Sequence, residues 1–266
     1  MSPARPGAAR PEEPPQVVAA VDPALIEHVA VRAAQARDRI ASAGGDPERV
    51  RIVAVTKGFG PDHVAAAFAA GLTEVGENYA DELLSKWGTI GRAGTWHFLG
   101  AVQRNKVPRL AQFVDCWQAI ARAVEGDAIR RHRSGPSGPQ PSRSSPSGPS
   151  GTVPGSDLEP PALLVEVDTT GLARRGGCAP DDVAGVVAGL RDLGCRVEGL
   201  MTVAPPGDAS VARRAFELVA RLREELGLAE LSMGMSGDLE QAVGAGSTMV
   251  RLGTALFGPR PQRPRL

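Results

Sequence analysis

The chain has 266 residues, of which 42% are hydrophobic and 23% charged, and this composition indicates a soluble globular protein of one large domain or two small ones. Thirty basic residues balance thirty acidic ones, which argues against nucleic acid or an anionic membrane as a partner. The three cysteines form no CxxC pair and no metal spacing with histidine, as expected for reduced thiols in the cytoplasm. No segment approaches the ~20 apolar residues of a membrane span, and the N-terminus lacks the apolar core of a secretory signal.

Two segments have compositions typical of disorder. Residues 1–16 are polar and rich in proline and alanine, and residues 134–156 consist almost wholly of serine, proline and glycine. Such segments cannot bury enough apolar surface to offset the entropy lost on ordering. Residues 261–266 are expected to form a short tail.

Between these segments, short apolar strands alternate with helical patterns. An amphipathic helix is predicted first, at residues 23–45. Strands are then predicted at residues 50–56, 72–78, 95–100, 114–120, 162–169, 197–204, 230–235 and 248–258, with helical segments between them. The pattern near Pro108 predicts a helix interrupted by that proline.

Eight strand–helix units favour parallel strands joined by crossover helices, and this predicts an α/β fold with a closed (β/α)8 TIM barrel. An open doubly wound sheet is the alternative that periodicity leaves open. Because residues 134–156 fall between the fourth and fifth units, we interpret them as an insertion within one barrel domain of residues 17–260.

If the fold is a barrel, its site lies at the carboxyl ends of the strands, where Lys57 follows the first strand. A lysine at a strand end can simply be solvated. Alternatively, partial desolvation near the barrel axis lowers its pKa and makes the amine a nucleophile toward a carbonyl. Gly58 and Gly60 would allow a ligand to approach the backbone closely.

The last two strand ends predict an anion site. Ser236 stands at a strand-to-helix turn, at a suitable N-cap position, and Gly253 and Thr254 follow the last strand. Barrels often bind phosphate with the loops after strands seven and eight. Arg251 interrupts an apolar run and is expected either to reach the ligand or to need a buried partner, whereas His97 is interpreted as a core residue.

Together, these features resemble the alanine-racemase-type barrel that binds pyridoxal 5′-phosphate (PLP), and more closely the YggS/PROSC-type PLP homeostasis proteins (the YggS-like PLP-binding family). The matching strings lie in order from about residue 50 to 258. They are "VAVTK", "GENYADELLSKW", "WHFLGAVQRNK", "GLMTVAPP" and "LSMGMSGDLEQAVGAGSTMVRLGTALFG".

The resemblance implies a role for each matching residue. Lys57 would form the internal aldimine with PLP, Asn78 would lie beside the ring, and Arg251 would face the pyridine nitrogen. An arginine there leaves the ring nitrogen unprotonated and so restrains carbanion chemistry. The remaining residues of the implied cofactor site are Ser236, Gly253 and Thr254 at the phosphate and Met201 near the end of strand six.

The sequence departs from the family pattern after the fifth strand. Asp168 and Arg175 stand where the family usually has an asparagine and a lysine. Arg175 keeps the positive charge, but a guanidinium is effectively never deprotonated and cannot form an imine. Any role of that lysine in moving PLP is therefore in doubt here.

The resemblance implies a protein that holds PLP as a lysine aldimine in intracellular PLP homeostasis, passing it to PLP-dependent apo-enzymes, without efficient catalysis. A two-base racemase needs a second acid/base, and only "PRPQRPRL" follows Gly258, so we expect no second domain to supply one; the single tyrosine is Tyr79. The alternatives are a slow PLP-dependent amino-acid racemase or related PLP enzyme with Lys57 as sole base, or a barrel enzyme that binds a sugar phosphate. We expect a monomer without metal, because the implied site needs no second subunit.

Overall fold

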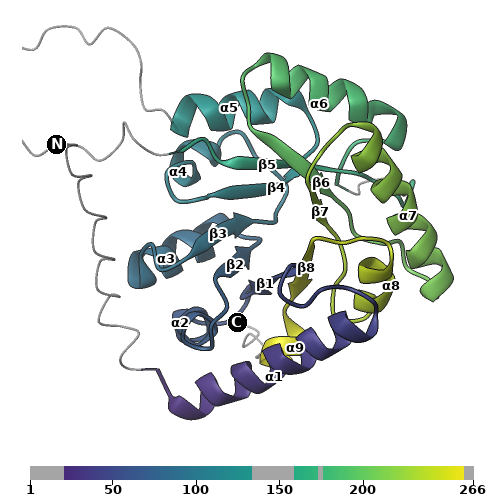
Figure 1. Cartoon of the computed structure of the whole chain (residues 1–266). Coiled ribbons are helices and arrows are strands. Elements are labelled where there is room, and N and C mark those ends of the chain that lie inside the picture. The colour runs from purple at the N-terminus through teal and green to yellow at the C-terminus, as the bar shows by residue number, and fades with distance from the viewer. Residues whose placement is uncertain (1–20, 134–158, 173–175, 261–266) are drawn as a thin grey trace, which may run out of the picture.

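The computed structural model describes residues 21–133, 159–172 and 176–260, and their strands close into one parallel barrel (Figure 1). Each strand pairs with the next, and β1 pairs with β8, where Val53 lies opposite Arg251. The fold class predicted from the sequence is confirmed. The strands are β1 Arg51–Val55, β2 Glu74–Glu77, β3 Thr95–Phe98, β4 Cys116–Ile120, β5 Ala162–Glu166, β6 Val197–Met201, β7 Glu230–Ser232 and β8 Met249–Leu252.

Helices surround the barrel in the ring that Figure 1 shows. They are α1 Pro23–Ser42, α2 Pro61–Ala69, α3 Ala80–Ile90, α4 Val107–Leu110, α5 Ala123–Arg133, α6 Val183–Asp192, α7 Ala209–Glu225, α8 Leu239–Gly244 and α9 Thr254–Phe257, with a 3-10 turn at Pro180–Asp182. The first helix, α1, precedes the barrel and packs against α2, α8 and α9. It therefore spans the seam where the first and last units of the barrel meet.

The strands β1 and β5 contain nearly continuous apolar runs, IVAV and ALLV, because both of their faces are covered. All five residues of β4 are buried, and four of the five in β1. Helices cover the outer faces, and side chains fill the barrel, as is usual for parallel sheets. The largest core side chains include Trp96 and Trp117, which are fully buried.

The predicted elements are in general longer than the observed ones, as three examples show. The predicted strand 248–258 ends at Leu252, because the chain turns at Gly253 and continues as α9. The interrupted helix around Pro108 consists only of α4, and the helix predicted at 23–45 ends at Ser42. The disorder predicted for residues 1–16 and 134–156, and the tail 261–266, lie outside the described residues.

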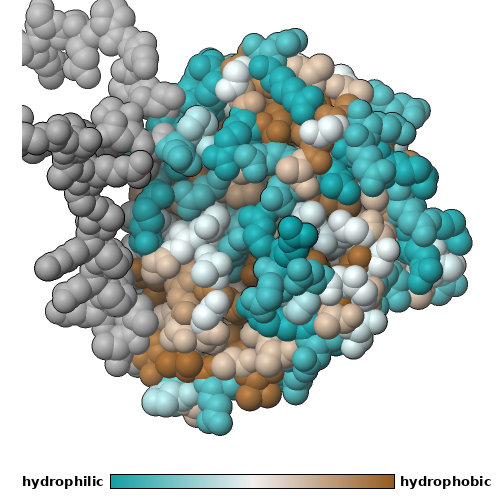
Figure 2. Space-filling view, in the orientation of Figure 1, coloured by the Kyte–Doolittle hydropathy of each residue, from teal (hydrophilic) through white to brown (hydrophobic). Residues whose placement is uncertain are grey.

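None of the described helices is long and apolar enough to cross a bilayer, and no three metal-ligating side chains of the described residues lie together as a metal site would need. On the face seen in Figure 2, hydrophilic residues are widespread, and the hydrophobic ones lie in separate groups at its lower and upper edges.

Candidate functional site

A cavity of about 400 Å³ lies at the carboxyl ends of the strands and is called here the carboxyl-end cavity. All seven cofactor-site residues expected from the sequence line it: Lys57, Asn78, Met201, Ser236, Arg251, Gly253 and Thr254. They come from β1, β2, β6, β7 and β8 or from the loops that follow these strands. Closure of the barrel brings them together, although they are up to about two hundred positions apart in the chain.

Lys57 is the one lysine that lines this cavity. The sequence contains three lysines, Lys57, Lys86 and Lys106, and the other two line neither of the barrel's two large cavities. Burial lowers the pKa of the half-buried Lys57, and the positive charges of Arg260 and Arg251 lower it further, against the attraction of Glu77. A lowered pKa makes more of the neutral amine available, and the neutral amine is the nucleophile.

A buried ion pair fixes the backbone that carries Lys57. Lys86 Nζ lies 2.6 Å from a carboxylate oxygen of Glu77 and donates to the carbonyl of Thr56 at 2.7 Å. The neighbouring Gly58 adopts a left-handed φ of 81°, and its N–H donates to Glu82. Lys86 pairs with Glu77 and also lies 3.6 Å from Glu82, whereas no described carboxylate lies within ion-pair distance of Lys57.

Asn78 and Met201 line the cavity on two of its sides. The side-chain Oδ1 of Asn78 is buried and has no hydrogen-bond partner among the described residues. Buried polar atoms without a partner are rare in proteins, so this amide fits a polar group of a ligand. Met201 is buried, and together with Val203, Leu99 and Phe59 it gives the cavity an apolar wall for a flat ring.

The loops after β7 and β8 provide donors for an anion. Among the described residues, no acceptor takes the backbone N–H groups of Ser236, Gly237, Gly253 and Thr254, and all four residues line the cavity. The Ser236 hydroxyl links the two loops by accepting from Ala255 N at 3.2 Å. Unengaged N–H groups with two hydroxyls are a donor set that suits a phosphate.

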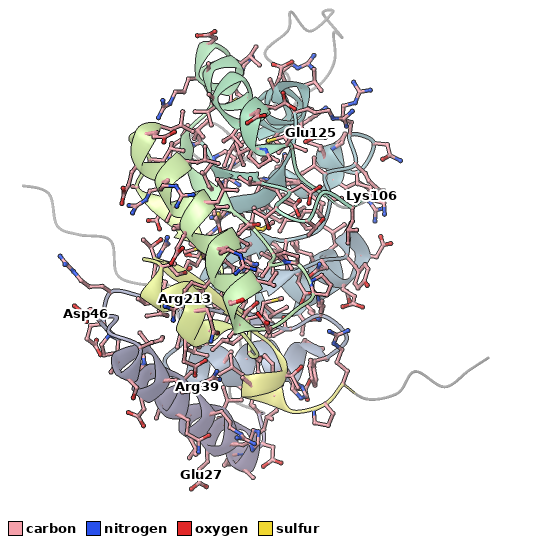
Figure 3. The ribbon with its side chains drawn as sticks, turned by 90° about the vertical axis from the view of Figure 1, so that its right-hand side faces the viewer. Glu27, Arg39, Asp46, Lys106, Glu125 and Arg213 are labelled. Atoms are coloured by element: carbon pink, nitrogen blue, oxygen red, sulfur yellow. The ribbon has the colours of Figure 1, made fainter. Side chains whose placement is uncertain are left out.

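The expected N-cap role of Ser236 is wrong. Helix α8 begins at Leu239, and Asp238 occupies the N-cap position. Position 253 suits glycine, because an added Cβ would lie 3.2 Å from the carbonyl oxygen of Val55 on β1. From the outside, Arg39 of α1 supports the Ser236 loop by donating to the Ser236 carbonyl at 3.1 Å and pairing with Glu240 at 2.6 Å (Figure 3).

Arg251 is buried, and every hydrogen bond described for it goes to a neutral oxygen. Its Nη1 donates to the carbonyl and the hydroxyl of Ser232, both at 2.8 Å, and its Nη2 donates to the Thr202 carbonyl at 2.8 Å. Burial lowers its pKa to about 10, against the attraction of Asp238 and Glu166. The guanidinium therefore stays charged at neutral pH and lines the cavity without a carboxylate in contact.

Sequence reasoning missed two charged residues of the cavity. Glu166 lies at the end of β5, and burial raises its pKa against the attraction of Arg251. Arg260 lines the opening and lies in a segment that sequence reasoning treated only as a terminal stretch. The signal for Glu166 was present in "ALLVEVD", where a carboxylate interrupts an apolar strand.

The departure at Asp168 has a local structural role. Its Oδ1 accepts from the N–H and the hydroxyl of Thr170, at 2.8 and 2.6 Å, and so shapes the turn after β5. Asp168 does not line the carboxyl-end cavity. Arg175 lies outside the described residues.

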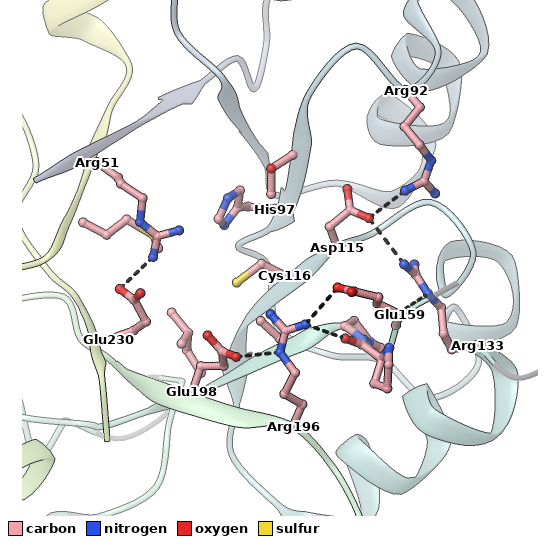
Figure 4. Close-up of a pocket in the computed structure, with 16 residues that line it drawn as sticks. Arg51, Arg92, His97, Asp115, Cys116, Arg133, Glu159, Arg196, Glu198 and Glu230 are labelled. Atoms are coloured by element: carbon pink, nitrogen blue, oxygen red, sulfur yellow. Dashed lines mark hydrogen bonds and ion pairs between the residues drawn. The ribbon is translucent and has the colours of Figure 1, made fainter. Parts of the chain in front are cut away.

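A second cavity, of about 410 Å³, lies at the amino ends of the strands and is called here the amino-end cavity (Figure 4). Its charged side chains bind one another: Arg51 pairs with Glu230 at 2.7 Å, and Arg92 with Asp115 at 3.1 Å. Arg196 pairs with Glu198 at 2.6 Å. Its arginines are thus already neutralised, so the cavity resembles the carboxyl-end cavity in size but not in chemistry.

Comparisons with known proteins identify the family of this barrel. Residues 29–261 match the family model of the alanine racemase N-terminal domain. The pyridoxal phosphate homeostasis protein of Pseudomonas aeruginosa is 35% identical over 89% of this chain and 96% of its own length. That of Deinococcus radiodurans is 36% identical over 83% of this chain and 95% of its own length.

A solved structure extends the comparison to the backbone. The structure of PipY from Synechococcus elongatus with PLP bound has 28% sequence identity and a TM-score of 0.66, over 84% of this chain and 100% of PipY. A family match over most of the chain, together with relatives above 30% identity over nearly their full length, establishes the relationship. The chain belongs to the alanine racemase N-terminal domain family and, within it, to the family of the pyridoxal phosphate homeostasis proteins.

Proposed function

We propose that this protein binds PLP covalently through Lys57 in the carboxyl-end cavity and serves PLP homeostasis rather than efficient catalysis. One observation carries the proposal: the sole cavity-lining lysine has no carboxylate partner among the described residues and shares its cavity with the unengaged N–H groups of the Ser236 and Gly253 loops. An amine and a phosphate cradle in one cavity match a molecule that carries both an aldehyde and a phosphate.

The other cavity-lining residues fit the remaining parts of PLP. Asn78 offers a buried amide without a partner, Met201 an apolar surface, and Arg251 a permanent donor for the ring nitrogen. When bound, PLP supplies an aldehyde that condenses with amines and a ring that withdraws electrons. Because Arg251 does not give up a proton at neutral pH, it leaves a ring nitrogen unprotonated and weakens that withdrawal.

The proposal is tested by absorbance of purified protein mixed with PLP. The amine of Lys57 attacks the aldehyde carbon and one water leaves, so a new visible band is expected. Borohydride should reduce the linkage, and peptide mapping should place the label on Lys57. Lys57→Ala should lose the band, whereas the control Lys106→Ala should keep it; a label on Lys86, Lys106 or the N-terminal amine contradicts the proposal.

Slow turnover of an amino acid is a second candidate, and Glu166 favours it. A carboxyl with a raised pKa that lines the same cavity could act as the second acid/base beside Lys57. The sequence's single tyrosine, Tyr79, is 59% exposed and does not line the cavity. Racemisation that is lost in both Lys57→Ala and Glu166→Gln would favour an amino-acid racemase. If the protein turns over none of the amino acids tested, the result would favour a PLP-holding protein without catalytic activity.

We further propose that the protein is a cytoplasmic monomer that transfers PLP to PLP-dependent apo-enzymes, and that residues 17–260 form one domain with 134–156 as an insertion. The insertion proposal is supported by the elements on either side of residues 134–156. Arg133 is the last residue of α5, Ala162 is the first residue of β5, and both elements belong to the same barrel. Light scattering tests the monomer. Reactivation of an apo-enzyme by the loaded protein tests transfer, and cleavage within 134–156 that leaves the fragments associated supports one domain.

A further inference from the structure

A line of buried polar side chains runs through the barrel interior from Arg251 toward the amino-end cavity. Arg251 Nη1 donates to Ser232 Oγ at 2.8 Å, and Ser232 Oγ donates to Gln118 Oε1 at 2.7 Å. Gln118 Nε2 lies 2.8 Å from His97 Nδ1, and His97 Nε2 lies 3.1 Å from Glu74 Oε2. Ser232, Gln118 and His97 are at most 1% exposed, so the line is closed to water along its middle.

The hydrogen bonds of the line all run in one direction, with each group donating toward Glu74, because the arginine at the other end can only donate. Arginine has no acceptor, so Ser232 Oγ accepts from Arg251 and passes its own proton to Gln118 Oε1. The amide group of Gln118 then donates at its other end, so His97 Nδ1 accepts and the neutral ring carries its proton on Nε2. That proton faces Glu74, although the 3.1 Å contact does not have the geometry of a good hydrogen bond.

The line of hydrogen bonds affects the orientation of the Arg251 guanidinium relative to a ligand in the cavity. Three hydrogen bonds, two to Ser232 and one to Thr202, use three of the five guanidinium donors. The donors that remain belong to a group that lines the carboxyl-end cavity. The Ser232 hydroxyl has a single proton, which it donates to Gln118 Oε1. This bond fixes the hydroxyl so that its oxygen accepts from Arg251 and cannot rotate away from it.

We propose that Gln118 is a positioning residue for Arg251: through Ser232 it fixes the guanidinium in the orientation that faces the ring of the ligand. Gln118 does not line the carboxyl-end cavity, so its action on the ligand is indirect. The part that concerns PLP rests on the function proposed above. The hydrogen-bond line itself does not rest on the proposed function, because it is a property of the protein without ligand.

The ligand-free protein tests the line by nuclear magnetic resonance of nitrogen-15. The signals of His97, assigned with a His97→Gln variant, should show a neutral ring protonated on Nε2. In Gln118→Glu the carboxylate cannot donate to Nδ1, so these signals should move to a ring that carries a proton on Nδ1. A wild-type His97 protonated on Nδ1, or one unchanged in Gln118→Glu, overturns the proposed direction.

The same spectra test the hold on Arg251 directly. Slow rotation of its guanidinium should give separate Nη signals in the wild type, and Gln118→Met and Ser232→Ala should merge them. Leu164→Ala is the matched control, since Leu164 is buried in the barrel interior and forms no part of the line. Loss of the separate signals in that control, or their persistence in both line variants, overturns the positioning role.

With PLP, Gln118→Met and Ser232→Ala should weaken binding about five- to tenfold and shift the pH at which the absorbance band changes, and Arg251→Gln should shift that pH in the same direction. Leu164→Ala should stay within about twofold of the wild type even if it melts earlier. Equal effects in the control mean a merely structural role for Gln118. If the wild type forms no adduct at all, the proposed function fails, whereas the spectra without ligand still decide the role of Gln118.

Discussion

The two ends of the barrel enclose cavities of nearly equal volume, about 400 Å³ and about 410 Å³, but they use charge in opposite ways. At the amino end, Arg51, Arg92 and Arg196 are each bound to a carboxylate. At the carboxyl end, Lys57 and Arg251 have no described carboxylate in contact, and nearby backbone N–H groups are unengaged. Availability of donors, rather than volume, distinguishes a ligand site from a structural cavity.

Two lysines at the carboxyl end show how this availability arises. Lys86 is almost completely buried and bound to Glu77, whereas Lys57 is half-buried beside the positive charges of Arg251 and Arg260. The buried carboxylate of Glu77, whose charge also acts on Lys57, is thus paired with Lys86. Lys57 is thereby left without an ion-pair partner among the described residues.

The largest expected effect comes from breaking the buried pair. Lys86→Met should lower the free energy of unfolding by about 3–5 kcal/mol, because it leaves the carboxylate of Glu77 buried and uncompensated. Denaturant titration measures the loss. As the control, Arg109→Met removes the exposed pair with Asp81 and should cost about 0–1 kcal/mol. Similar losses in the two variants would mean that the buried pair has no special role.

The next effect separates the two ends of the barrel. Arg133 lines the amino-end cavity, and its Nη1 donates to the carbonyls of Ala111 and Val114, both at 2.9 Å. Arg133→Met should lower the free energy of unfolding by about 1–3 kcal/mol, because it leaves two buried carbonyls without this donor. PLP affinity, measured by titration of the absorbance band, should stay unchanged; a parallel loss of affinity would show that the cavities are not independent.

The smallest effect sharpens the role of charge around Lys57. Arg260→Ala removes a positive charge that lowers the pKa of Lys57, so that pKa should rise toward its ordinary value. Less neutral amine is then present below the pKa, and the rate of adduct formation should fall at pH 7 and recover at higher pH. Because Arg260 is exposed, its interaction contributes about 1 kcal/mol or less, about fivefold in rate. Arg260→Lys should keep the wild-type profile, and a shift to lower pH in Arg260→Ala would contradict this account.

The sequence was sufficient to predict the barrel because eight short strand patterns alternate with helical patterns along the chain. It failed where two elements share one run: "MVRLGTALF" looks like a single strand, although Gly253 ends β8 and α9 begins at Thr254. Hydrophobic periodicity cannot distinguish a strand from a helix when each has only four residues, as β8 and α9 do. The seven cavity-lining residues that were predicted lie near the carboxyl ends of strands or in the segments that follow them.

The residues that sequence reasoning missed depend on contacts between distant segments. Glu166 belongs to the cavity because β5 ends there, and Arg260 because the chain after α9 brings its side chain close to Gly58. His97 was correctly predicted as a core residue. Its position between Glu74 and Gln118 follows from the pairing of β2, β3 and β4, which no local pattern contains.

The pairing of β1 with β8 has a consequence for biosynthesis. Lys57 follows the first strand, whereas Arg251, Gly253 and Thr254 belong to the last strand or follow it, and Val53 lies opposite Arg251. A chain emerging from the ribosome therefore presents Lys57 long before the loop that we propose to bind the phosphate is synthesised. Under the proposed function, cofactor capture has to wait until the barrel is complete, and a truncated translation product is expected not to retain the cofactor.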